Sequence, residues 1–286
     1  MIQRSPRRHR TAAGTIRRQP RVRRASAGLS PTRAAAILTM LIAAGVMYGL
    51  MATPAFGLSR LDISGTALTS EDAIRDRIGL GEGTNLVGLA TDPIAARVRQ
   101  LPSVRDAQVS VGLPDVLRVE VTERRPIVVW AVGDRRFAVD AGGLLFADVT
   151  TDPSGLTHGI PIVADERTSG ATLGIASTLD PVDLDAATRL GSLTPSQVGS
   201  RAAAFRVHIT DDRGFTLSSG SGGWLAVFGF YTPSQRTPAL IPGQIQLLGG
   251  LLAGREDTVQ TVILADDREG TFIPKPTPRP SPTARP

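Results

Sequence analysis

The sequence of 286 residues has no cysteine, which excludes disulfide bonds and zinc–thiolate sites. Its single lysine, Lys275, is not preceded by glycine, so the G-x-x-x-x-G-K loop that cradles phosphate is absent as well. Aromatic residues make up 4% of the chain and there are three histidines. These scarcities remove most common routes to metal, redox or nucleotide chemistry, and we predict no cofactor.

A few polar residues still invite a catalytic interpretation. Ser219 and Ser221 lie among glycines, but no G-x-S-x-G elbow surrounds them. His208 falls on the polar face of a predicted strand, and the adjacent acids Asp211 and Asp212 fit a turn better than an acid–base pair. We therefore predict that the protein is not an enzyme. A membrane-anchored hydrolase using Ser221 or His208 remains an alternative.

Charge is also missing from one long apolar run, residues 34–59. At about 1.5 Å rise per residue, a helix over 34–55 spans a hydrocarbon core of roughly 30 Å. A cleavable signal peptide has a shorter apolar region and a small-residue cleavage site, for which Thr53-Pro54-Ala55 is a poor match. We predict an uncleaved signal-anchor helix over residues 34–57.

The 33 residues before this run contain ten of the 32 basic residues and none of the 26 acidic ones. The remaining chain carries 22 basic and 26 acidic residues, so the positive-inside rule keeps the N-terminus in the cytoplasm and places the bulk outside. Nucleic-acid binding by this tail through phosphate neutralisation is an alternative, but the tail has no aromatic residue for base stacking and no folded groove. We predict a disordered cytoplasmic tail over 1–33 whose orientation is set mainly by Arg17, Arg18, Arg21, Arg23, Arg24 and Arg33.

Residues 58–125 have the periodicity of a small α+β unit. Leu61 and Ile63 alternate with polar residues in a strand that ends at Gly65. Two short helices follow, the first capped near Thr69 and the second beginning at Asp92. Two further alternating strands then complete the order β-α-α-β-β, in which both helices can cover one face of a three-stranded sheet.

Several segments here carry a family resemblance: LPSV at 101–104, PDVL at 114–117, VTERRP at 121–126 and AVDAGGLLF at 138–146. Their order, after a basic tail and one apolar span, resembles the POTRA-containing bacterial cell-division family FtsQ (DivIB). The same residues define turns and strand ends, so they indicate a fold and not a reaction.

Residues 126–266 contain short segments, most of which alternate apolar and polar residues, and turns separate these segments. We predict a mainly antiparallel β domain with a few helices and a last strand near 259–265. Residues 267–286, with six prolines from position 274 onward, are predicted to be a disordered tail.

The resemblance implies a non-catalytic single-span scaffold of the division septum whose partners are the single-span proteins FtsB (DivIC) and FtsL. It also implies that late strands of the β domain hold these partners. We expect an exposed last strand to pair with partner backbone, and its residues would be Val259, Gln260, Thr261, Val262, Ile263 and Leu264. A POTRA protein of secretion or outer-membrane assembly is the other alternative, although such proteins usually have several POTRA units.

Overall fold

The computed structural model describes residues 30–151 and 155–276. The predicted basic tail, apart from its last residues, and the end of the predicted proline-rich tail lie outside these ranges. The chain divides into two units, of which the first ends at Ala52 and the second begins at Thr53. Each unit is considered by itself.

The first unit contains helix α1 (Pro31–Ala52), the apolar helix predicted from the charge-free run. Its 20-residue stretch Pro31–Leu50 is long and apolar enough to cross a membrane, with a mean hydropathy of 1.7. The helix begins and ends earlier than the predicted segment 34–57. Pro31 suits the first helical position, and Pro54 cannot continue a helix, which explains the end at Ala52.

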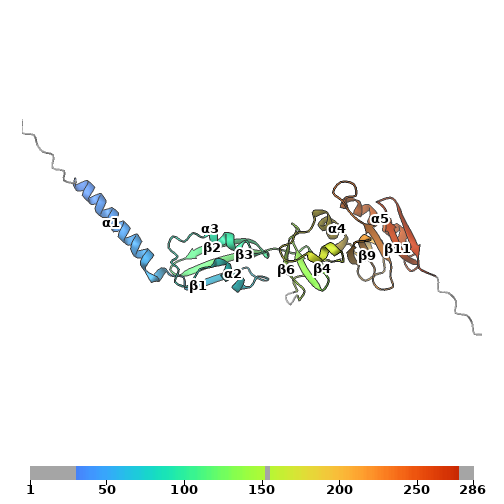
Figure 1. Cartoon of the computed structure of the whole chain (residues 1–286), viewed down its shortest axis with the longest axis horizontal. Coiled ribbons are helices and arrows are strands. Elements are labelled where there is room, and N and C mark those ends of the chain that lie inside the picture. The colour runs from blue at the N-terminus through green and yellow to red at the C-terminus, as the bar shows by residue number, and fades with distance from the viewer. Residues whose placement is uncertain (1–29, 152–154, 277–286) are drawn as a thin grey trace, which may run out of the picture. The chain divides into compact units, whose positions relative to one another are not determined.

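The smaller sheet region, residues 60–123, has the predicted β-α-α-β-β order (Figure 1). Strand β1 pairs in parallel with β3, and β3 pairs antiparallel with β2, so β3 is the central strand. Ile74, Ile78, Ile94 and Val98 from the two helices are buried against Leu117 and other residues of the sheet. The elements are β1 (Arg60–Ser64), α2 (Glu71–Ile78), α3 (Asp92–Val98), β2 (Val104–Gly112) and β3 (Val116–Glu123).

The start of α2 differs from the prediction by one residue. Ser70, not Thr69, is the N-cap, and its hydroxyl accepts a hydrogen bond from the Ala73 amide. Thr69 instead has its hydroxyl 2.7 Å from the Ser103 hydroxyl, and its amide donates to Glu123. Gly79 ends the helix in the left-handed conformation, as predicted.

The larger sheet region, residues 128–274, is a single nine-stranded sheet in the order β12-β11-β10-β9-β8-β7-β4-β5-β6. Five of its eight strand pairs are antiparallel, so the sheet is mainly antiparallel as expected. Its elements are β4 (Val128–Val132), β5 (Arg135–Val139), β6 (Leu145–Asp148), β7 (Ile162–Asp165), α4 (Pro181–Gly191), β8 (Arg206–Thr210), β9 (Gly214–Ser218), β10 (Leu225–Gly229), α5 (Ile241–Leu252), β11 (Val259–Leu264) and β12 (Gly270–Pro274).

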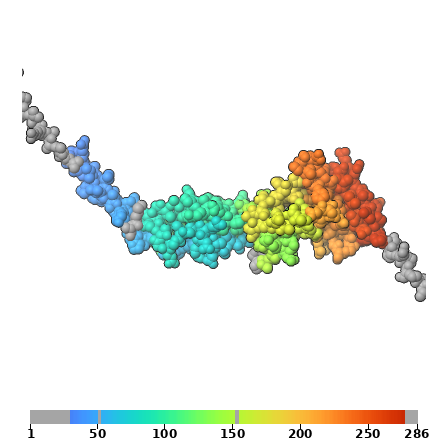
Figure 2. Space-filling model, in the orientation of Figure 1, coloured from blue at the N-terminus to red at the C-terminus, as the bar shows by residue number. Residues whose placement is uncertain are grey.

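Helices α4 and α5 cover one face of this sheet and bury its main core (Figure 1). Trp130, Val163, Val207, Leu217 and other inward residues alternate along the strands and pack beneath Leu190 of α4 and Leu248 of α5. Figure 2 shows the residues from yellow-green to red as one continuous body. On the opposite face, a smaller cluster that includes Val129, Ala138 and Phe146 covers part of β4 to β6.

Candidate partner-docking edge

The predicted partner strand is found as β11, with the bounds Val259–Leu264. It is not an exposed last strand, and that part of the prediction is wrong: β11 pairs in parallel with β10 and antiparallel with β12. Val259, Val262 and Leu264 are buried in the main core, whereas Gln260, Thr261 and Ile263 lie on the other face. The backbone of β11 is therefore occupied on both sides.

Strand β12 (Gly270–Pro274) takes the outer position, where the sequence predicted a disordered tail. The Lys275 amide donates to the Thr258 carbonyl, and the Ala265 amide donates to the Glu269 carbonyl, so both ends of β12 are held to β11. Pro274 is compatible with this place because an edge strand leaves one row of amides without ladder partners. The density of prolines from position 274 onward concealed the strand in the sequence.

The two outer strands of this sheet differ in how their edges are covered. Beside β6, the Leu145 amide donates to the Ser177 carbonyl and the Ala176 amide donates to the Leu145 carbonyl. Residues 176–178 therefore cover that edge, and Leu144 and Thr178 pair through their backbones in antiparallel fashion. Among the described residues, no segment pairs with the outer side of β12. Such an edge can accept an extended segment of another chain.

Apolar side chains gather on the sheet face next to this edge. Phe230, which follows β10, and Ile263 of β11 and Ile273 of β12 are 49%, 39% and 47% exposed. With Val227, Thr261 and residues of the β8–β9 turn they line a cavity of about 460 Å³. An apolar surface beside a free backbone edge can bind the side chains of an added strand as well as its backbone.

Arg236 fixes the ends of the strands that lead to this edge. Its guanidinium donates to the carbonyls of Phe228, Leu264 and Ala265, and it lies 5.8 Å from the centre of the Tyr231 ring. The side chain thus joins the end of β10 to the end of β11. No motif surrounds Arg236 in the sequence, so the sequence contains no signal for this role.

Glu256 anchors the other end of β11. Its carboxylate accepts hydrogen bonds from Ser200 Oγ, from the Arg201 amide and, at 3.0 Å, from Trp224 Nε1. Burial by itself raises the pKa of Glu256, but these bonds outweigh it and lower the pKa from 4.5 to about 2. The ionised carboxylate therefore holds the loop before β8 and the start of β10 to the start of β11.

The residues considered for hydrolysis do not form a catalytic group. The Ser219 hydroxyl accepts a hydrogen bond from the Trp224 amide and closes the turn between β9 and β10, where Ser221 also lies. His208 is on β8, with Nδ1 2.7 Å from a Glu166 carboxylate oxygen. Asp211 accepts from the amide and hydroxyl of Thr168 and so ties a turn to a neighbouring loop. Over residues 30–151 and 155–276, no group of three acidic or histidine side chains could hold a metal ion.

The comparisons with known proteins agree with this fold. A family model described as the FtsQ-type POTRA domain matches residues 56–124. The chain is 28% identical over 191 residues to the cell division protein FtsQ of Mycobacteroides abscessus, covering 65% of this chain and 57% of that protein. It is 27% identical over 188 residues to FtsQ of Streptomyces coelicolor, covering 65% and 70% of the two chains. Against FtsQ of Streptomyces venezuelae it is 33% identical over 115 residues, or 40% and 42% of the two chains.

The fold and the family model together define the class of protein: it contains a POTRA domain and, near the N-terminus of the described residues, an apolar helix long enough to cross a membrane. Within that class the POTRA domain is of the FtsQ type, and the predicted resemblance to the FtsQ family of cell-division proteins is confirmed. The match spans 57% of the Mycobacteroides protein's length, so the activities of that whole protein are not transferred to this chain.

Proposed function

We propose that this protein is a non-catalytic scaffold of bacterial cell division, anchored in the cell membrane by α1, with its N-terminus in the cytoplasm and its bulk outside. The arginine-rich sequence before α1 supports this orientation through the positive-inside rule. The proposed site of action is the division septum, because the relatives are cell division proteins. We place the POTRA domain at 58–125 and the β domain from 126 through β12.

The open edge of β12 is the observation on which the scaffold function depends. A partner of the FtsB (DivIC) and FtsL type would add an extended segment to this edge. Backbone hydrogen bonds would supply much of the affinity, and Ile263, Ile273 and Phe230 would receive apolar side chains. Membrane anchoring of both proteins would raise the effective concentration of the partner near the edge. The predicted residues Thr261 and Ile263 remain in this proposal as surface next to the edge, not as the edge itself.

A charged substitution beside the edge tests this function. The change Ile273→Asp places a carboxylate where an apolar contact is proposed, and it should weaken partner capture at least tenfold. The matched control is Ile175→Asp, because Ile175 is 49% exposed and lies in the loop between β7 and α4. Capture is measured by co-purification of the tagged chain with co-expressed FtsB- and FtsL-type proteins. Equal capture by both variants would contradict docking at β12.

A further inference from the structure

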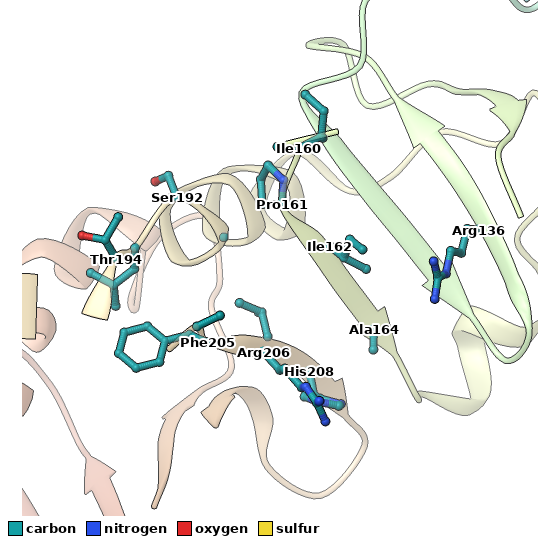
Figure 3. A pocket seen from close by; sticks show the side chains of 15 residues that line it. Arg136, Ile160, Pro161, Ile162, Ala164, Ser192, Thr194, Phe205, Arg206 and His208 are labelled. Carbon is teal, nitrogen blue, oxygen red and sulfur yellow. The ribbon is translucent and has the colours of Figure 1, made fainter. Parts of the chain in front are cut away.

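A second, larger hollow lies on the same sheet, at β7 and β8. It has a volume of about 870 Å³ and is lined by residues of β5, β7 and β8, by the segments just before β7 and β8, and by the end of α4 with the loop after it. Figure 3 shows Arg136 and His208 on either side of Ala164, with Ile160 and Pro161 at one end and Phe205 near Thr194 at another. Nothing in the proposed scaffold function uses this hollow.

The sheet register explains why the surface is hollow at this point. Arg136 pairs with Ala131, Ala131 with Ala164, and Ala164 with His208, so these four residues form one row across four strands. Neighbouring strands lie about 4.8 Å apart, which puts roughly 14 Å between the backbones of Arg136 and His208. The two positions between them are alanines and leave that space unfilled. Helices α4 and α5 cover the opposite face.

The hollow is positively charged and its arginines are unpaired. Arg136 and Arg206 are exposed, and neither guanidinium has a hydrogen bond or ion pair within the described residues. No acidic residue is among the fifteen that line the hollow. Glu166 lies next to it but is bonded to His208. Elsewhere in the larger sheet region the arginines are mostly paired with acids, as in Arg167–Asp183, Arg189–Asp185 and Arg201–Asp257.

The rest of the lining is largely apolar. Ile162 is 46% exposed at the mouth of the hollow, and Ile160, Leu193 and Phe205 extend the apolar surface toward the loop after α4. A small inorganic anion would contact the arginines and leave this surface bare. A guanidinium binds a carboxylate through two parallel hydrogen bonds. The combination fits a peptide in which an acidic side chain has apolar neighbours.

We propose that this hollow, the Arg136–Arg206 pocket, docks an acidic, partly apolar peptide segment of a second protein. The carboxylate would lie over Ala164 between Arg136 and Arg206, and the apolar neighbours would contact Ile162 and Phe205. The pocket is on β5, β7 and β8, whereas the edge is β12, with β11, β10 and β9 between them. The chain would therefore hold two partner segments at once, and the pocket does not depend on docking at β12.

The test uses the full chain in lipid nanodiscs and a phage-displayed library of random twelve-residue peptides. We expect the enriched peptides to carry Asp or Glu beside apolar residues. A synthetic peptide from this set should bind at least tenfold more weakly to the Arg136→Gln/Arg206→Gln variant, and also when its acid is replaced by the amide. The matched control is Arg60→Gln/Arg118→Gln, which removes two exposed positive charges from the smaller sheet region and should bind normally.

A second variant separates the contribution of the pocket's shape to peptide binding from the contribution of its charge. Ala164→Leu fills the hollow without changing charge and should weaken the same peptide by a similar factor. Unchanged binding of the peptide to this variant would show that the peptide is attracted to surface charge alone, and it would contradict binding in the hollow. Two other results would contradict an acidic peptide as the occupant. One is enrichment of peptides without acidic residues, and the other is saturation of the hollow by inorganic phosphate with no peptide selected. Capture of FtsB- and FtsL-type proteins should persist in the arginine variant, so failure of this proposal is distinguishable from failure of docking at β12.

Discussion

At the residue scale, polar side chains that each make several hydrogen bonds join loops to the larger sheet. Asp165 is fully buried as a side chain and accepts from Trp130 Nε1, while Arg167 bridges Asp165 and Asp183. Burial raises the pKa of Asp183, against the lowering effect of Arg167. Glu256 is the corresponding group at the start of β11, with its side chain 16% exposed.

We predict that Glu256→Gln destabilises the larger sheet region at neutral pH. A pKa lowered from 4.5 to about 2 corresponds to roughly 3 kcal/mol of stability. Because the folded-state pKa is the lower one, this contribution is complete above pH 4.5 and is lost as the pH falls through about 2. The variant should therefore lose less stability than the parent between pH 5 and pH 2.

Urea unfolding followed by tryptophan fluorescence measures this, since both tryptophans, Trp130 and Trp224, are in the larger sheet region. The control is Glu269→Gln, at an exposed acid in the β11–β12 turn. Equal pH slopes for Glu256→Gln and the parent would contradict the role given to this carboxylate.

Residue-scale features were predictable where they depend on local chain chemistry. Gly79 as a helix end and the turn at Asp140 follow from residue types alone, and Asp140 accepts from the amides of Gly142 and Leu144. The bonds of Glu256 to Ser200 and Trp224 join residues distant in sequence. No local pattern encodes such pairings, so the sequence did not reveal them.

At the scale of the elements, close approach of backbones limits which residues can end a strand. Gly65 ends β1 with φ +82°, and a Cβ at this position would lie 2.0 Å from the Val121 carbonyl oxygen of β3. Gly83 has φ +78° but open space around it. Alanine substitutions at Gly65 and Gly83 therefore separate two contributions to the loss of folding free energy: the left-handed backbone conformation and the clash with a neighbouring backbone.

We predict that Gly83→Ala costs about 1 kcal/mol and Gly65→Ala at least about 2 kcal/mol more, because the carbonyl cannot move without breaking the β1–β3 pairing. Amide hydrogen exchange in β1 and β3 reports the difference. Similar protection factors in the two variants would show that β3 yields to the added methyl group.

Element prediction succeeded where alternation was clear and failed where proline dominated. The β-α-α-β-β order and most strands of the larger sheet followed from periodicity. Strand β12 was not predicted because it is only five residues long and ends at Pro274, where a proline-rich sequence begins. Its stability comes from pairing with β11, which local propensity does not reveal. The open edge of the candidate site therefore lies one strand beyond the predicted one.

At the scale of the whole molecule, the proposed scaffold combines a membrane anchor with two binding surfaces on one sheet. Helix α1 supplies the anchor, β12 an unpaired backbone edge, and the Arg136–Arg206 pocket a cationic hollow. The two proposed surfaces would recognise different features of their partners, backbone in one case and acidic side chains in the other. A scaffold of this kind needs no catalytic group.

Hydrogen–deuterium exchange of the full chain, with and without co-purified FtsB- and FtsL-type proteins, tests docking at the β12 edge most directly. A segment that pairs with β12 gives its outward amides new hydrogen-bond acceptors. Docking at the β12 edge predicts at least tenfold slower exchange in residues 270–273 on binding and little change in β6, whose edge residues 176–178 already cover. Stable partner binding with unchanged exchange in β12 would contradict it.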